Sequence, residues 1–229
     1  MTIFFDQIND EVNSGTTHTV AADVPKRGGL YRDYLKRVFE FGTILVLTPI
    51  VVPMVLLLAL MAGRDGHNPF FWNDRVGKGG KTFRMLKLRS MVPNAEQLLE
   101  AHLVANPDAR EEWESSQKLK DDPRITRFGR FLRKTSLDEL PQLWNVFTGE
   151  MALVGPRPML PNQRPLYPGL AYYALRPGIT GLWQVSDRNE VEFAKRADFD
   201  REYYVQMSFS MDISLMAKTV GVVLKATGY

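Results

Sequence analysis

The feature that most constrains this chain is a run of 23 residues, Phe41 to Gly63, without a single charged side chain. A helix of that length reaches about 35 Å, which is enough to cross the hydrocarbon core of a bilayer. The run is longer, and begins further into the chain, than is typical of a cleaved signal peptide. We therefore expect residues 41–63 to form a helix embedded in a membrane.

Two prolines, Pro49 and Pro53, lie in the middle of this run. Each removes a backbone donor and bends a helix, and at a spacing of four residues the two bends add on one face. Basic residues flank the run on both sides, so the positive-inside tendency places both ends in the cytoplasm. They are Arg32, Lys36, Arg37, Arg64, Arg75, Lys78 and Lys81. These features favour a re-entrant helix, and an ordinary kinked span is the alternative because membrane helices tolerate proline.

The chain divides into three parts. Residues 1–30 are polar and lack periodicity, and we expect them to form a flexible N-terminal tail. Residues 31–64 form the predicted re-entrant membrane helix. Residues 65–229 form a cytoplasmic domain that has to hold any catalytic site. Within it, aromatic residues around the glycines of residues 67–84 predict a short β-hairpin.

Two segments of the cytoplasmic domain are predicted to be amphipathic helices at the membrane interface. In residues 124–134 arginines recur at every third position between apolar residues, and residues 197–227 mix aromatic and apolar residues with few charges. A solvated basic face is the alternative for residues 124–134, and a helix or helix pair packed in the core is the alternative for residues 197–227. The expected fold is therefore mainly α with a small β-hairpin, in a monotopic membrane protein with a proline-kinked re-entrant helix and interfacial helices.

Composition narrows the chemistry. The chain has no cysteine, which excludes disulfide frameworks, zinc–thiolate sites and cysteine nucleophiles, and its three histidines leave acid–base chemistry mainly to carboxylates. A net charge of +3 suits anionic lipids or phosphorylated ligands. Nucleic acid as a partner would account for the basic residues but not for the apolar run, so no nucleic acid is expected.

An adjacent pair of carboxylates, Asp138 and Glu139, is the first candidate for chemistry. Ser136, followed three residues later by Glu139, also matches a capping box at a helix start, which is the purely structural alternative. Carboxylates that hold a divalent cation, next to arginines that hold phosphates, are typical of phosphoryl-transfer sites. An aspartate can also act as the nucleophile and take the phosphoryl group covalently.

Basic side chains that suit phosphates lie on either side of this pair in the sequence. Arg157 stands between two prolines, which hold its guanidinium in a rigid frame. A turn with a surface arginine is the alternative. Lys87 is a further candidate phosphate contact.

The glycine-rich segment 176–185 is a second candidate for ligand binding. Its glycines would allow a ligand to approach the backbone closely. Trp183 within it is expected to pack in a core rather than to stack on a base.

Several motifs occur in the order found in one known family. They are Lys36-Arg37-Val38-Phe39, Arg75-Val76-Gly77, Lys87-Leu88-Arg89-Ser90-Met91, the segment from Asp122 to Arg133, Ser136-Leu137-Asp138-Glu139-Leu140-Pro141-Gln142-Leu143, Val154-Gly155-Pro156-Arg157-Pro158 and Arg176-Pro177-Gly178-Ile179-Thr180-Gly181. Through them, residues 34–228 resemble the bacterial sugar transferase family, the monotopic phosphoglycosyl transferases of exopolysaccharide and glycoconjugate assembly.

The resemblance implies transfer of a sugar 1-phosphate from a UDP-sugar to polyprenyl (undecaprenyl) phosphate, with release of UMP and with Mg²⁺ as cofactor. It implies a covalent phosphosugar-aspartyl intermediate, with Asp138 as the nucleophile and Glu139 as the Mg²⁺ ligand. Arg133 and Arg157 would hold phosphates, with Lys87 as a further contact. The resemblance also implies that the protein lies among the lipids of the bacterial inner membrane, at the cytoplasmic face. Its reaction would be the first membrane step of assembly.

One departure from the family concerns the break in the membrane helix. The family has a Ser-Pro pair at the break, whereas here Val52 precedes Pro53, and Pro49 is additional. A serine hydroxyl can bond a carbonyl freed at the break and valine cannot. The kink is therefore expected to rely on the two prolines.

A membrane-anchored scaffold of a polysaccharide assembly complex, without catalytic activity, is the alternative from another class. In a scaffold, Asp138 and Glu139 would only cap a helix, and the arginines would only bind lipid. The motifs leave the identity of the sugar and the formation of a homodimer open.

Overall fold

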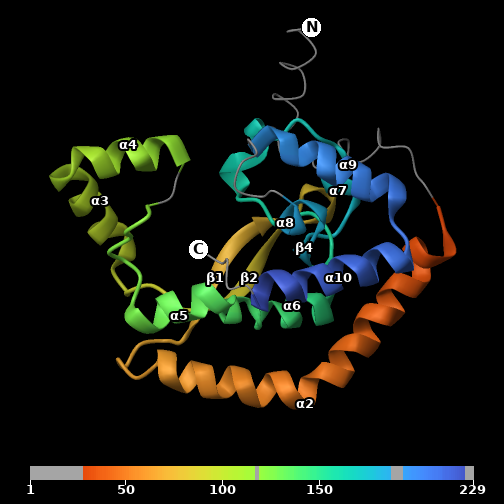
Figure 1. Ribbon diagram of the computed structural model, residues 1–229, viewed down its shortest axis with the longest axis horizontal. Helices are drawn as coiled ribbons and strands as arrows, with labels where there is room; N and C mark the ends of the chain where they lie inside the picture. The colour runs from red at the N-terminus through yellow and green to blue at the C-terminus, as the bar shows by residue number, and fades with distance from the viewer. Residues whose placement is uncertain (1–27, 117–118, 187–192, 225–229) are drawn as a thin grey trace, which may run out of the picture.

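The computed structural model describes residues 28–116, 119–186 and 193–224, so residues 1–27 of the predicted tail lie outside the described residues. The helices are α2 (Lys36–Ala62), α3 (Ala95–Ala105), α4 (Pro107–Ser116), α5 (Arg127–Thr135), α6 (Gln142–Thr148), α7 (Ala171–Ala174), α8 (Leu182–Val185), α9 (Arg196–Gln206) and α10 (Phe209–Leu224). The strands are β1 (Phe70–Val76), β2 (Thr82–Leu88), β3 (Ala152–Val154) and β4 (Gly178–Thr180). The prediction of a mainly helical fold with a small β-hairpin is confirmed (Figure 1).

β1 and β2 form the predicted antiparallel hairpin, with a register that begins at Phe70 opposite Leu88. The turn passes through Gly79 and Gly80, whose φ angles of 68° and 77° lie in the left-handed region that glycine enters without a steric penalty. A second pairing, of β3 with β4 in parallel, is not among the predictions. Its strands are only three residues long, too short for an alternating pattern to show.

The apolar run forms α2, a continuous helix of 27 residues that contains Pro49 and Pro53. A short π-helical turn, Tyr31–Leu35, leads into it. The helix is long and apolar enough to cross a membrane, and only 17% of its most apolar window is buried. Its ribbon changes direction part-way along (Figure 1), and proline inside a helix is a recognised cause of such a bend.

Both halves of α2 also pack against the rest of the molecule. In the first half Ile44 is buried in the central core. In the second half Leu58 and Ala59 form a separate cluster with Leu88 of β2 and Leu132 of α5. α2 is therefore built into the folded domain and is not a detached helix.

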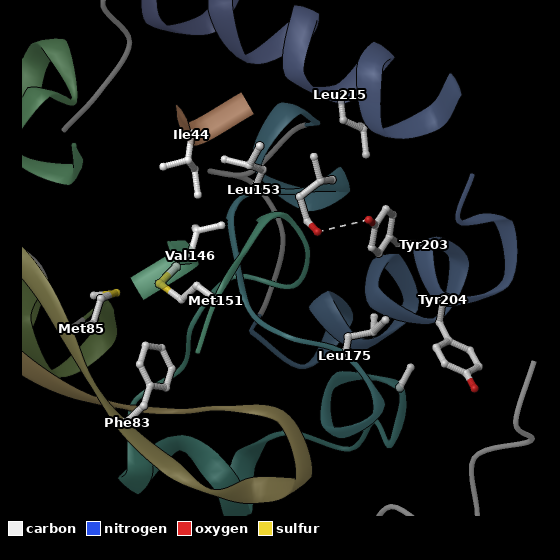
Figure 2. Packing of buried hydrophobic residues seen from close by; sticks show 12 residues of the cluster. Ile44, Phe83, Met85, Val146, Met151, Leu153, Leu175, Tyr203, Tyr204 and Leu215 are labelled. Carbon is white, nitrogen blue, oxygen red and sulfur yellow. Dashed lines mark hydrogen bonds between the residues drawn. The ribbon is translucent and has the colours of Figure 1, made fainter. Parts of the chain in front are cut away.

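The central core gathers side chains from elements far apart in the sequence (Figure 2). The hairpin contributes Phe83 and Met85, and the C-terminal helices contribute Tyr203 and Leu215. The Tyr203 hydroxyl oxygen lies 3.1 Å from the Val154 carbonyl oxygen of β3, and the dashed line in Figure 2 joins these two atoms. α9 and α10 are the helical pair expected near residues 197–227, and both supply this core.

A buried polar network joins the start of α2 to α10. Lys36 Nζ lies 2.5 Å from Asp212 Oδ2 and 3.4 Å from Glu40 Oε1. Glu40 also accepts from Arg176 Nη2 at 3.0 Å, and the Tyr203 hydroxyl donates to Asp212 at 2.6 Å. Because Lys36, Glu40 and Asp212 are almost fully buried, these charges are satisfied by one another instead of by water.

The basic stripe predicted over residues 124–134 is not one continuous face. Arg124 precedes α5 and pairs with Asp122, and Arg133 turns inward. Arg127 and Arg130 are exposed. Arg124 and Arg133 therefore make contacts within the domain, and of the four arginines only Arg127 and Arg130 are exposed.

Candidate active site

Asp138 and Glu139 lie on one 3₁₀ turn, Leu137–Glu139, between α5 and α6. Just before it, Ser136 has a left-handed backbone with a φ of 56°, and its N–H donates to carbonyl oxygens in the last turn of α5. Its side chain makes no capping hydrogen bond to the turn that follows. The capping-box alternative is therefore wrong, because the Ser136 side chain does not cap the 3₁₀ turn that this residue precedes.

Lys87 of β2 lies beside both carboxylates. Its Nζ is 2.7 Å from Glu139 Oε1 and 4.0 Å from Asp138 Oδ2. The strand is held against α6 by the buried side chain of Asn145, whose Oδ1 accepts from the N–H of Leu86 at 3.0 Å. The hairpin thus fixes the position of the Lys87 ammonium relative to the carboxylate turn.

The two carboxylates differ in their response to this environment. Burial raises the pKa of Asp138 above its usual value, and the charge of Lys87 opposes the shift only in part. Burial also acts to raise the pKa of Glu139, but the charges of Lys87 and Arg157 outweigh it and hold that pKa below its usual value. Burial thus desolvates both carboxylates: Glu139 is the more firmly ionised, which suits a cation ligand, and Asp138 is the more basic, which suits a nucleophile.

The predicted arginines lie on two sides of the turn. Arg133 Nε donates to Ser90 Oγ at 2.9 Å. Burial lowers the pKa of Arg133, and the nearby charge of Asp138 opposes that shift. Arg157 is exposed, and its guanidinium carbon lies 5.8 Å from the centre of the Trp183 ring. The structure therefore brings Lys87 and both arginines into electrostatic reach of the carboxylate pair.

Arg75 of the hairpin belongs to the same group, although it is not among the predicted site residues. Its Nη1 donates to the Pro158 carbonyl oxygen at 3.4 Å. Burial, and then the charge of Arg157, lowers the pKa of Arg75 to about 10, and its own charge helps to lower the pKa of Glu139. The only sequence signal for Arg75 is its place in the Arg75-Val76-Gly77 motif. That motif does not indicate that Arg75 lies near Arg157, 82 positions further along the chain.

A divalent cation would find a partial ligand set at the turn. No cluster of three or more Asp, Glu, His or Cys side chains that could hold a metal ion occurs among the described residues. Mg²⁺ usually binds through one or two carboxylates together with substrate phosphates and waters. Glu139, whose side chain is 25% exposed, and its neighbour Asp138 fit a metal that binds together with a phosphorylated substrate.

Three glycines near β3 and β4 serve backbone packing, not the approach of a ligand as expected for residues 176–185. A Cβ on Gly178 would lie 2.1 Å from the Gly155 nitrogen, and one on Gly181 would lie 2.1 Å from the Gly155 carbonyl oxygen. Only glycine lets these segments come so close. Trp183 is buried, as expected.

This chain is similar to known proteins over most of its length. A family model described as bacterial sugar transferase matches residues 31–226. The UDP-galactose-lipid carrier transferase of Erwinia amylovora is 49% identical over 85% of this chain and 41% of its own length. The undecaprenyl-phosphate galactose phosphotransferase of Salmonella typhimurium is 45% identical over the same two shares. The exopolysaccharide production protein ExoY of Rhizobium meliloti is 41% identical over 90% of this chain and 93% of its own length.

The chain thus spans about two fifths of the length of the first two relatives and nearly all of ExoY. The family match includes α2, the hairpin, the carboxylate turn and the two C-terminal helices. Because the family model matches residues 31–226, the chain belongs to the bacterial sugar transferase family.

Proposed function

We propose that this chain transfers a sugar 1-phosphate from a UDP-sugar to undecaprenyl phosphate, releasing UMP, as the first membrane step of exopolysaccharide or glycoconjugate assembly. The observation that carries the proposal is the carboxylate pair, in which buried Asp138 and ionised Glu139 share the neighbour Lys87. The names of the relatives, a UDP-galactose-lipid carrier transferase and an undecaprenyl-phosphate galactose phosphotransferase, support both substrates.

The proposed reaction has two steps at one phosphorus atom. A carboxylate oxygen of Asp138 attacks the sugar-bearing phosphorus of the donor, the bond to the oxygen between the two phosphates breaks, and UMP leaves with that oxygen. An oxygen of the lipid phosphate then attacks the same phosphorus of the aspartyl phosphosugar. The Asp138 carboxylate is freed, and the lipid carries the sugar on a diphosphate. Neither step needs a net proton transfer.

The cations around the turn would offset the repulsion between an anionic nucleophile and an anionic diphosphate. Arg157, exposed and close to Glu139, is placed to meet the donor phosphates, and Arg133 lies on the side of Asp138. The Lys87 ammonium lies beside both carboxylates and offsets the repulsion between their negative charges. Glu139 would hold a Mg²⁺ ion, which would supply further charge neutralisation at the phosphates.

We place both ends of α2 at the cytoplasmic face of the inner membrane. Because both halves of the helix bury side chains against the same domain, a full crossing would separate one half from its contacts. Three exposed aromatic rings stack on one another in a row. The Phe147 ring of α6 lies between the Trp144 ring of the same helix and the Phe41 ring of α2. Exposed aromatic rings suit the headgroup region, where a lipid phosphate lies.

Asp138→Asn is expected to lower UMP release by at least about 1,000-fold, because the amide keeps the size of the carboxylate but is not a nucleophile. The assay uses protein in nanodiscs with undecaprenyl phosphate, Mg²⁺ and a panel of UDP-sugars. The phosphosugar adduct should also vanish from the intact-mass spectrum of the quenched enzyme. Asp121→Asn changes an exposed carboxylate outside the turn and should keep wild-type turnover.

Normal turnover by Asp138→Asn would remove the nucleophile assignment. A chelator that leaves wild-type release unchanged would remove the Mg²⁺ requirement. Folded wild-type protein that releases no UMP with any donor, together with a Glu139→Gln variant that supports polysaccharide export in cells, would favour the scaffold.

A further inference from the structure

A pocket opens beside the carboxylate turn and shares Arg157 with it. Its closed interior has room for about one water-sized group, and the space that also counts its open mouth is about 250 Å³. The side chains that matter for its chemistry are Arg157, Tyr167, Trp183, Phe193, Arg196 and Asp200. Arg157 lines this pocket, and its charge also lowers the pKa of Glu139. A ligand whose phosphates contact Arg157 would therefore lie next to the pocket.

Asp200 of α9 supplies the acceptor in this pocket. Its side chain is buried, with 6% of the residue exposed, and the Tyr167 hydroxyl donates to its Oδ2 at 2.5 Å. None of the residues that the structure describes donates to Oδ1. Burial raises the pKa of Asp200 to about 7, against the hydrogen bond from Tyr167 and the charge of Arg196. A donor from a ligand would complete the hydrogen bonding of this carboxyl group.

Two donors in the pocket wall have no acceptor. Trp183 Nε1 and Arg196 Nε are both buried, and within the described part of the chain neither makes a hydrogen bond. The Arg196 guanidinium carbon lies 4.1 Å from the centre of the Trp183 ring, so it covers a face of the indole. Buried N–H groups without acceptors are uncommon in folded proteins, and a ligand oxygen would satisfy them.

A hydroxyl group answers both deficits within the space of one water-sized group, because the same oxygen donates to a carboxylate and accepts from an N–H. The diphosphate of a nucleotide sugar has no proton to donate to Asp200 at neutral pH. A planar base would be expected to stack on the indole, but Arg196 already lies over that ring. The pocket therefore suits a hydroxyl group of a polyhydroxyl ring that lies at its mouth.

We propose that this pocket binds the hydroxyl groups of a sugar ring of the donor, with Asp200 accepting from them and Arg196 donating to them. The inference rests on the proposed function, which supplies a nucleotide sugar whose phosphates meet Arg157. Such a donor carries two polyhydroxyl rings, the transferred hexosyl ring and the ribosyl ring of the nucleotide. Both have the chemistry that the pocket recognises.

Asp200→Asn tests the pocket. The amide oxygen still accepts from Tyr167, but the amide nitrogen cannot accept from a sugar hydroxyl. The KM for the donor, measured by UMP release, should rise about 10- to 100-fold, with kcat changed by less than about threefold. Asp198→Asn, exposed on the same helix, is the matched control and should keep the wild-type KM.

UMP binding, measured by calorimetry on the same protein in nanodiscs, separates the two rings. If the hexosyl ring fills the pocket, Asp200→Asn binds UMP as wild type does and loses part of its preference between UDP-glucose and its C4 epimer UDP-galactose. If the ribosyl ring fills it, UMP affinity falls by the same factor by which the KM rises.

An unchanged donor KM with unchanged UMP affinity in folded Asp200→Asn overturns the inference. If that variant has lost its thermal transition, Arg196→Lys takes its place, since it keeps the charge but lacks Nε, and the same two outcomes apply. Wild-type protein that is silent with every donor overturns the proposed function and the inference with it, whereas active wild type with an indifferent variant overturns the inference alone.

Discussion

Lys87 contacts two carboxylates at once, at 2.7 Å for Glu139 and 4.0 Å for Asp138. For both carboxyl groups, burial acts to raise the pKa and the charge of Lys87 acts to lower it. One ammonium from the hairpin therefore opposes the protonation that burial alone would favour at two neighbouring positions. The pH response of the site should depend on this residue more than on either carboxylate alone.

Lys87→Ala is expected to move the acidic limb of the pH profile of kcat/KM to higher pH. Without the ammonium the pKa of each carboxylate rises, so the protons that disable the nucleophile and the cation ligand bind at higher pH. The limb reports apparent values of the coupled pair. Lys81→Ala, exposed beside the hairpin turn, should leave the limb in place. A wild-type limb in Lys87→Ala would contradict this electrostatic role.

At the scale of elements, the docking of α5 on the end of the hairpin depends on Gly129. A Cβ there would lie 1.9 Å from the Ser90 carbonyl oxygen, and the clash is with backbone that cannot rotate away. The same contact lets Arg133 Nε reach Ser90 Oγ. The helix begins where the Thr126 hydroxyl accepts from the Gly129 N–H at 2.8 Å. This docking sets where the carboxylate turn starts.

Gly129→Ala is expected to lower the free energy of unfolding by about 3 kcal/mol, because the added methyl group overpacks a backbone contact. For a chain of this size the melting temperature should fall by roughly 6–12 °C. Gly221→Ala in α10 is the matched control: nothing lies within 4 Å of its Cβ, so the variant should melt at or slightly above the wild-type temperature. Thermal unfolding in nanodiscs measures both, and equal melting temperatures would refute the packing argument.

Elements were predictable where a short-range pattern carries the signal. The hairpin and the helical pair near residues 197–227 follow from periodicity and turn residues. β3 and β4 do not, because three residues show no period and the partner strand lies far along the chain. The Ser136 spacing imitates a capping box, but the left-handed backbone at this serine reverses its role.

The site shows the same division. Lys87 is a motif residue, and the strand pairing of the hairpin brings it to the carboxylate turn. Asp200 reads in the sequence as an ordinary charge on an amphipathic helix. Its burial arises only when α9 packs its side chain against Tyr167, a contact across 33 residues. Glu40 and Arg176 likewise meet across 136 residues, which no local pattern reports.

At the scale of the whole molecule, α2 is attached to one domain near both of its ends. Its first turns hold Lys36 in the buried network with Asp212 of α10, and its last turns place Leu58 and Ala59 against the hairpin and α5. Two attachments on the same domain, with a bend between them, favour a helix that enters and leaves the same leaflet (Figure 1). The position of the two ends relative to the membrane is therefore the property to measure.

The absence of cysteine allows single reporters to be introduced one at a time. Tyr34→Cys, exposed before α2, and Lys78→Cys, exposed after it, should both react with an impermeant maleimide from the cytoplasmic side of oriented vesicles. In a Pro49→Ala/Pro53→Ala background the restored backbone hydrogen bonds straighten the helix, so a fraction of the Lys78→Cys reporter should become reactive from the opposite side.

The two reporters separate the causes of the bend. Because buried contacts of the second half of α2 oppose a full crossing, only part of the double-proline variant should change sides. A Lys78→Cys reporter that reacts from the opposite side with both prolines present would overturn the re-entrant placement. A double-proline variant with both reporters still cytoplasmic would instead assign the bend to the packing of α2 on the domain, and Pro49 and Pro53 would then accommodate a path that the domain imposes.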